Sequence, residues 1–237
     1  MKKTIKLAGV PVGIELRYPD ALPTLAPYLC DEPPAVSVSV PAQELAAARD
    51  IYEPGSTEPY IEYMELCQDI SDALLPFGRV VFHGAAFMWR GQAWIFAALS
   101  GTGKTTQYLR WKELYGDEVQ IINGDKPVLS VGDGSVTVHP SPWNGKEGMG
   151  QQLSAPLGGI ILLRQRGENR IRRVSPREAV GPVFVQLMIS RGTADNVRAA
   201  CRLEDIMLRQ TPVWMLENRG DAASAMLCRS ALMEAIT

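Results

Sequence analysis

The 237-residue sequence predicts an α/β fold: a mixed, largely antiparallel sheet around a P-loop, with flanking helices and a small N-terminal α/β segment. Three observations predict this fold. A glycine-rich segment, residues 98–106, lies between an apolar run and a helical pattern. A link of hairpin length joins the two apolar runs that precede it, which favours antiparallel neighbours over strands connected by a helix. Further along the chain, glycine-containing turns separate short strand-like runs.

Residues 1–75 differ from the rest in their frequent prolines, and we expect them to form the N-terminal segment. The expected elements are a hairpin over 4–17, a strand over 35–40, a helix from 41 to about 52 and a helix over 60–75. In the last of these, apolar residues recur at helical spacing from Tyr63 to Leu74, which is typical of a helix that faces a core.

Residues 76–237 are expected to form the domain that contains the P-loop. Strands are expected over 79–90, 93–99, 119–122, 127–131, 135–139, 157–163, 170–174 and 213–216, and helices over 107–115, 175–189, 196–208 and 222–236. The turn Gly132-Asp133-Gly134 predicts a hairpin, and the segment Gly167-Glu168-Asn169 predicts pairing of 157–163 with 170–174. The sequence Ser175-Pro176-Arg177-Glu178 is a capping box that opens a helix.

Composition excludes several classes of protein. A net charge of −2, with 46% hydrophobic and 21% charged residues, is typical of a globular protein and lacks the basic surplus of a nucleic-acid binder. No apolar run approaches the roughly 20 residues that cross a bilayer, and the N-terminus lacks a signal-peptide run, so we expect a cytoplasmic protein that does not bind membranes. The 4 cysteines are far apart and are expected to be buried free thiols.

The glycine-rich segment predicts a nucleotide-binding site. It reads Ala-Leu-Ser-Gly-Thr-Gly-Lys-Thr-Thr, with Ala98 where the strict motif has glycine. Glycines allow backbone N–H groups to point at phosphate oxygens, and the following helix adds its positive end. Lys104 is expected to reach the β- and γ-phosphates of ATP, and the Thr105 hydroxyl to bind Mg²⁺. The residues expected to bind the cofactors are Ser100, Gly101, Thr102, Gly103, Lys104, Thr105 and Thr106. The alternative is a glycine-rich turn with Lys104 in solvent.

Three further residues are candidates for catalysis. Asp125 follows the strand 119–122, where a carboxylate can bind the Mg²⁺ of a nucleotide, although Asn-Gly-Asp is also an ordinary turn. His83 lies on the strand that should fold back toward the loop, either as a phosphate contact or proton acceptor or as a buried core residue. Lys146, in the loop 141–148, could offset charge on a transferred phosphoryl group, or the loop could simply be exposed.

Together these residues resemble the HPr kinase/phosphorylase-like family, which is related in fold to phosphoenolpyruvate carboxykinase. The resemblance covers about residues 79–165. His83 matches the histidine on the strand before the family's loop, Ala98–Thr105 match the loop, and Gly124-Asp125 match its Asp-Asp pair. Gly124 departs from the pair, and this implies that the base is Asp125, His83 or Glu147, or that the kinase is weakened. The segments Asn-Gly-Asp-Lys-Pro and Pro-Trp-Asn-Gly-Lys-Glu resemble a bacterial subgroup that includes peptide-modifying relatives.

The sequence and the resemblance lead to one main hypothesis and two alternatives. The main hypothesis is Mg²⁺- and ATP-dependent phosphoryl transfer to a hydroxyl of an unknown peptide, protein or small-molecule acceptor. The alternatives are an ATP-binding regulatory module with little turnover and a carboxykinase-like enzyme that acts on a small acid. The sequence is compatible with either a monomer or a homo-oligomer.

Overall fold

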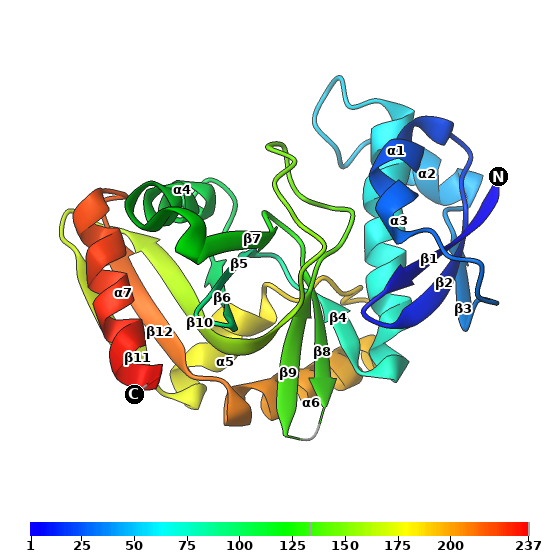
Figure 1. Cartoon of the computed structure of the whole chain (residues 1–237). Helices are drawn as coiled ribbons and strands as arrows, with labels where there is room; N and C mark the ends of the chain where they lie inside the picture. The colour runs from blue at the N-terminus through cyan, green and yellow to red at the C-terminus, as the bar shows by residue number, and fades with distance from the viewer. Residues whose placement is uncertain (133, 237) are drawn as a thin grey trace.

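The computed structural model describes residues 1–132 and 134–236, and of Ile236 the backbone alone. The chain forms two neighbouring parts, which Figure 1 shows side by side. We call residues 1–75 the N-terminal module. Its strands are β1 (Lys2–Leu7), β2 (Val10–Glu15) and β3 (Val36–Ser39), and its helices are α1 (Leu22–Leu25), α2 (Ala42–Ala48) and α3 (Glu58–Leu74). Strand β2 pairs antiparallel with β1 and parallel with β3, so the module has a small sheet of its own.

The larger part is built on a mixed sheet with the strand order β4-β8-β9-β10-β6-β5-β7, to which β12 and β11 add at β10. Its strands are β4 (Arg79–Val81), β5 (Ala85–Trp89), β6 (Gln92–Ala97), β7 (Val119–Asn123), β8 (Val128–Gly132), β9 (Ser135–His139), β10 (Ala155–Gln165), β11 (Arg170–Val174) and β12 (Val213–Asn218). Within this larger sheet, β10 runs parallel to β6 and β12, whereas the other pairings of its described strands are antiparallel. The expected mixed, largely antiparallel sheet is therefore present.

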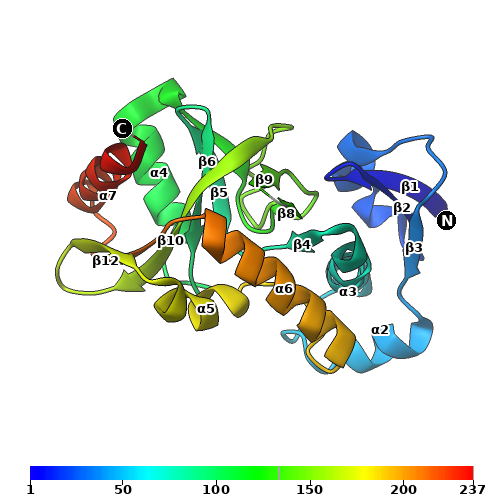
Figure 2. The same ribbon diagram turned by 90° about the horizontal axis from the view of Figure 1, so that it is seen from below.

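Helices cover both faces of this sheet, as Figures 1 and 2 show. They are α4 (Lys104–Tyr115), α5 (Pro176–Phe184), α6 (Ala194–Gln210) and α7 (Ala222–Ile236). Buried side chains of α4 and α7 share one hydrophobic cluster with the sheet, and those of α5 and α6 share another on the opposite face. In the first cluster, Trp111 of α4 packs against Phe87 of β5 with ring centroids 5.0 Å apart. This aromatic packing holds α4 against the sheet.

The expected strand over 79–90 is wrong, because the chain breaks after β4. Strand β4 pairs with β8, whereas β5 pairs with β6 and β7. Between them the N–H of His83 donates to the carbonyl of Gln186, and the N–H of Gly84 donates to that of Asp125. The break therefore turns His83 out of the sheet and toward the end of β7.

The expected pairing of 157–163 with 170–174 is also wrong. Both strands form, but β12 lies between them, parallel to β10 and antiparallel to β11. The hairpin of β8 and β9 is confirmed by its register, while Asp133 of its turn lies outside the described residues. The helix expected over 175–189 begins with the predicted capping box and ends earlier, at Phe184.

The structure bears on two predictions made from composition, the burial of the cysteines and the lack of a membrane-spanning segment. All 4 cysteines are free, but Cys201 is exposed on α6 and Cys30 is half-buried, so the prediction that the thiols are buried holds only for Cys67 and Cys228. Within the described residues, no helix combines the length and the apolar character needed to cross a membrane. The expected boundary at residue 75 stays a prediction.

Candidate functional site

The glycine-rich loop, residues 98–106, connects the end of β6 to the start of α4. Gly101 and Gly103 adopt φ angles of +76° and +99°, a region that residues with side chains rarely adopt. Ala98 is 7% exposed and belongs to the hydrophobic cluster beneath α4, so its methyl group packs into the core. The substitution of alanine for the first glycine of the motif is therefore compatible with this loop conformation.

Lys104 is the first residue of α4 and turns back across the loop. Its ammonium group donates to the carbonyl of Ala98 at 2.9 Å and lies 3.1 Å from Nε2 of His83. The side chain is largely buried, and this burial lowers the pKa of Lys104, although the charge of Asp125 acts in the opposite direction. A desolvated cation in this position is suited to interact with a phosphate group.

Asp125 is held by a turn that begins at Asn123, the last residue of β7. The side-chain oxygen of buried Asn123 accepts hydrogen bonds from the N–H groups of Asp125 and Lys126, at 2.9 and 2.6 Å, and its amide donates to the carbonyl of Ser141 at 3.1 Å. The carboxylate of Asp125 forms an ion pair with Lys126 and lies 3.4 Å from Nε2 of His83.

The Asp125 carboxylate is ionised at neutral pH. Its burial acts to raise the pKa, but the hydrogen bond with His83 and the charge of Lys126 outweigh burial and lower the pKa to about 2. Nε2 of His83 faces both a cation and a carboxylate, and Lys104 can only donate a hydrogen bond. A ring without a proton on Nε2 accepts from Lys104 there, whereas a ring with a proton on Nε2 donates to Asp125. A proton on His83 therefore decides which of the two residues it binds.

The structure around Gly124 leaves no space for the first aspartate of an Asp-Asp pair. A Cβ atom at Gly124 would lie 2.8 Å from the carbonyl oxygen of Asn144 and 3.1 Å from that of Met149. The N–H of Gly124 also donates to the carbonyl of Met149 at 2.9 Å. An aspartate cannot replace Gly124 unless the loop over residues 141–150 moves. We call this segment the 141–150 loop.

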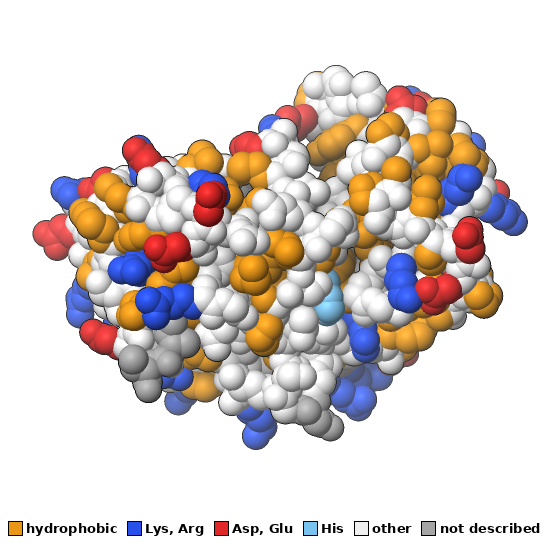
Figure 3. Space-filling model, in the orientation of Figure 1, with side chains coloured by type: hydrophobic (Ala, Val, Ile, Leu, Met, Phe, Trp, Pro, Cys, Tyr) orange, Lys and Arg blue, Asp and Glu red, His pale blue; other side chains and the backbone are white. Residues whose placement is uncertain are grey.

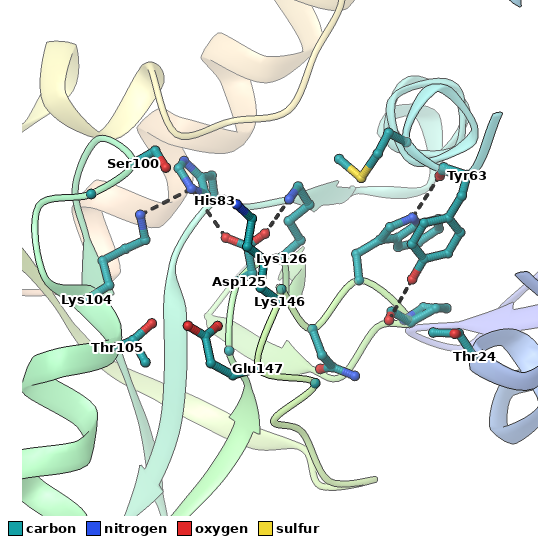
Figure 4. Close-up of a pocket in the computed structure, with 18 of the residues that line it drawn as sticks. Thr24, Tyr63, His83, Ser100, Lys104, Thr105, Asp125, Lys126, Lys146 and Glu147 are labelled. Atoms are coloured by element: carbon teal, nitrogen blue, oxygen red, sulfur yellow. Dashed lines mark hydrogen bonds and ion pairs between the residues drawn. The ribbon is translucent and has the colours of Figure 1, made fainter. Parts of the chain in front are cut away.

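A cavity of about 820 Å³ collects the candidate residues. Six residues of the glycine-rich loop line it, namely Ser100, Gly101, Gly103, Lys104, Thr105 and Thr106, together with His83, Asp125, Lys126, Lys146 and Glu147. Thr102 was expected to bind the nucleotide, but it does not line the cavity. In Figure 4, His83 and Asp125 lie between the glycine-rich loop and α3, and Glu147 points toward the side where Thr105 lies.

Lys146 and Glu147 are exposed, and their side chains form no hydrogen bond or ion pair with the described residues. The structure thus places Lys146 in the same cavity as Lys104 but does not fix its ammonium group against a partner. Both side chains are free to meet a ligand that enters the cavity.

The donor set is compatible with magnesium bound together with phosphate. The described residues contain no group of three or more His, Cys, Asp or Glu side chains that could hold a metal ion by themselves. Mg²⁺ in phosphoryl-transfer sites is commonly bound by one or two protein oxygens and by the substrate's phosphates. The Thr105 hydroxyl and the ionised Asp125 carboxylate, which line the same cavity, are oxygens of this kind.

Sequence reasoning missed the residues that the N-terminal module adds to the cavity: Thr24, Tyr60, Tyr63 and Met64. It also missed Lys126, the ion-pair partner of Asp125. The run Asn-Gly-Asp-Lys could have indicated Lys126. An asparagine in a turn commonly accepts hydrogen bonds from backbone N–H groups two and three residues later, and this brings the side chains of Asp125 and Lys126 to the same place. The residues of the N-terminal module carry no such local signal.

Comparison with known proteins gives a distant structural likeness. No protein-family model matches this sequence, and no curated protein is significantly similar to it. Among solved structures, the Hpr(Ser) kinase/phosphatase from Coxiella burnetii matches over 66% of this chain and 99% of that chain, with a TM-score of 0.40 and 7% sequence identity.

Proposed function

We propose that this protein binds MgATP and transfers its terminal phosphoryl group to a hydroxyl group of an acceptor. One observation carries the proposal: three residues from different segments meet beside the N-terminus of α4, where Nε2 of His83 lies 3.1 Å from the Lys104 ammonium group and 3.4 Å from the Asp125 carboxylate. A cation, a proton acceptor and a carboxylate beside an anion-binding loop are the groups that phosphoryl transfer needs.

The residues divide this work according to their chemistry. The amides of residues 101–105 and Lys104 bind the phosphates, while Thr105 and Asp125 hold the metal. When bound, MgATP supplies the phosphoryl group and the charge of the metal. The acceptor oxygen bonds to the γ-phosphorus, the bond from this phosphorus to the β–γ bridging oxygen breaks, and ADP leaves.

His83 is the better candidate for the hydroxyl proton. A carboxylate with a pKa of about 2, as in Asp125, is a weak base at neutral pH and is suited to binding a cation. The proton is therefore assigned to Nε2 of His83, where Asp125 stabilises the resulting imidazolium. Lys146, which lines the same cavity, offsets charge on the transferred group.

The test is transfer of radioactive γ-phosphate to a mixed library of serine, threonine and tyrosine peptides. The wild type is expected to label peptides in the presence of Mg²⁺, and Asp125→Asn to reduce the rate at least 100-fold. Exposed Asp117, in a turn after α4, offers the matched control Asp117→Asn, which should retain full activity. Tight MgATP binding without transfer to any acceptor would instead favour an ATP-binding regulatory module. Full activity of Asp125→Asn would rule out its metal role.

A further inference from the structure

The cavity has two chemically different ends. The end beside the glycine-rich loop carries three lysines, two carboxylates and His83. The opposite end is contributed by the N-terminal module and the first residues of the 141–150 loop, and none of its residues is charged. They are Thr24, Tyr60, Tyr63, Met64, Pro142 and Trp143. Figure 4 shows Tyr63 and Thr24 across the cavity from Lys104, and Figure 3 shows a hollow with hydrophobic side chains inside it between the two parts of the molecule.

Tyr63 and Trp143 contact each other and hold this end of the cavity together, and their polar side-chain atoms already have hydrogen-bond partners. The rings of Tyr63 and Trp143 stack with centroids 5.6 Å apart. The Tyr63 hydroxyl donates to the carbonyl of Pro142 at 2.8 Å, and the indole N–H of Trp143 donates to the carbonyl of Tyr63 at 2.9 Å. These contacts fix α3 against the 141–150 loop, so the wall has a defined position relative to Lys146 and Asp125.

Tyr60, Met64 and Thr24 remain available to a ligand. Tyr60 is 47% exposed, and its hydroxyl forms no hydrogen bond with the described residues. Its ring is nevertheless held in place by an edge contact with Tyr52, at a centroid distance of 6.2 Å. Met64 is half-buried and packs against the core of the N-terminal module. A fixed aromatic ring and a flexible thioether form a surface that favours an apolar group.

The arrangement also indicates which ligand meets this wall. In the proposed function, Lys104 binds the terminal phosphate and Asp125 holds the Mg²⁺ beside it, and Figure 4 places Asp125 between the glycine-rich loop and α3. The terminal phosphate then faces the N-terminal module, and the acceptor hydroxyl must approach from that side. An acceptor whose group beside the hydroxyl is charged would find no opposite charge on Thr24, Tyr60 or Met64, and would lose its hydration there.

We propose that the N-terminal module forms the acceptor site, and that Tyr60 and Met64 bind an apolar side chain next to the hydroxyl-bearing residue of a peptide. A peptide supplies such a side chain at a fixed distance from its serine or threonine, while its backbone extends out of the open cavity. This inference rests on the proposed function for the orientation of the nucleotide. It adds a specificity that comes from the N-terminal module.

The experiment measures binding and transfer separately. Fluorescein-labelled peptides Gly-Ala-X-Ser-Ala-Gly, with X as Phe, Leu, Asp or Lys, are titrated with the full-length protein in the presence of MgADP, and anisotropy gives each Kd. The wild type is expected to bind the Phe and Leu peptides at least 10-fold more tightly than the Asp and Lys peptides. Tyr60→Ala and Met64→Ala should each reduce this preference at least 5-fold. Met64→Glu should shift the preference toward the Lys peptide.

Two controls separate this wall from the rest of the molecule. Met226, which is exposed on α7, offers the matched substitution Met226→Ala, which should leave every Kd unchanged. ATP and inorganic tripolyphosphate, each with Mg²⁺, should bind Tyr60→Ala as tightly as the wild type. If Tyr60→Ala weakens ATP but not tripolyphosphate, the wall holds the nucleobase and the proposal is overturned. It is equally overturned if the wild type shows no preference among the four peptides.

The outcome also distinguishes this inference from the proposed function. If the apolar preference exists and disappears in Tyr60→Ala and Met64→Ala, while the wild type transfers no phosphate, the wall binds peptides as proposed and the proposed phosphoryl transfer is wrong. If phosphate transfer occurs without any effect of these variants on peptide choice, the proposed function stands and the acceptor site fails.

Discussion

At the residue scale, the site depends on a lysine that is buried before any ligand binds. Lys104 is 8% exposed and is held by the carbonyl of Ala98, so its charge is desolvated in the free protein. Replacing Lys104 by alanine removes this buried cation, and the folded protein should lose little or no stability. The same change removes a charge-assisted interaction with phosphate, which is worth about 1.5–3 kcal/mol.

Lys104→Ala is therefore expected to raise the Kd for MgATP at least about 10-fold, since each factor of ten corresponds to about 1.4 kcal/mol. Isothermal titration calorimetry measures this change, and circular dichroism checks the fold. Lys112, a half-buried cation on the same helix that forms an ion pair with Asp117 and does not line the cavity, offers the matched control Lys112→Ala, for which the Kd should stay unchanged. An unchanged Kd for Lys104→Ala would mean that residues 98–106 form only a glycine-rich turn.

A second residue makes stability depend on pH. Glu204 of α6 is 4% exposed, and one of its carboxylate oxygens has no hydrogen-bond partner among the described residues. Burial raises the pKa of Glu204 to about 7, while a hydrogen bond from the backbone of Phe184 partly offsets the increase. Between the ordinary pKa of a glutamate and pH 7, the folded state binds more protons than the unfolded state. The stability that Glu204 contributes is thus present at low pH and is lost as the pH rises toward 7.

Glu204→Gln should remove this dependence because glutamine stays neutral. At pH 8 we expect the variant to be about 3 kcal/mol more stable than the wild type, or about 6–12 °C in Tm at this chain length, and at pH 4.5 about equal to it. Thermal melts at both pH values provide the measurement. A gain of equal size at the two pH values would show that deprotonation of Glu204 is not the cause.

At the element scale, α3 and the 141–150 loop depend on one another. The Pro142 carbonyl accepts hydrogen bonds from the Tyr63 hydroxyl and from the N–H of Asn144, and Tyr63→Phe removes the first of these while the ring still stacks on Trp143. The expected loss is about 1 kcal/mol in the free energy of unfolding, measured in urea. Trypsin should also cleave after Lys146 faster than in the wild type.

Tyr60→Phe is the matched control for this prediction. Tyr60 lies on the same helix, and its hydroxyl has no partner within the described chain, so its removal should change neither stability nor cleavage. Equal behaviour of the two variants would contradict the idea that the Tyr63 hydroxyl holds the 141–150 loop.

Local patterns predicted most of the elements, and the errors arise where distant segments compete for the same edge of a sheet. The sequence between β10 and β11 reads as a hairpin, but β12, about forty residues further along, lies between these two strands. The parallel pairing of β12 with β10 buries both β10 and β12. The run from Arg79 to Arg90 reads as one strand, but a Cβ at Gly84 would lie 2.6 Å from the side chain of Ile95. Neither fact can be read from nearby residues.

The same distinction holds for the candidate site. The glycine-rich loop and the residues His83 and Asp125 carry local signals, and the structure brings these residues together. The stack of Tyr63 on Trp143 joins residues 80 positions apart, so no local pattern marks it. The wall that the N-terminal module adds to the cavity is therefore a result of tertiary packing.

At the scale of the whole molecule, the N-terminal module and the larger part share a core. Val81, Val128 and Trp143 are at most 2% exposed and lie in the same hydrophobic cluster as the interior of the N-terminal module. Burying an apolar side chain of this size contributes about 1.5–3 kcal/mol. Exposing all three would cost a large share of the 5–15 kcal/mol that typically separates folded from unfolded states.

A chain that starts at residue 76 is therefore expected to lack a cooperative thermal transition, although it contains the whole glycine-rich loop. Circular dichroism and calorimetry on this fragment provide the measurement, with the full-length chain as reference. Adding residues 1–75 as a separate chain should restore a transition, because the missing surface is supplied again. A fragment that melts cooperatively near the Tm of the full-length protein would mean that the N-terminal module is an independent domain. The larger part would then fold without the residues that the N-terminal module adds to the cavity.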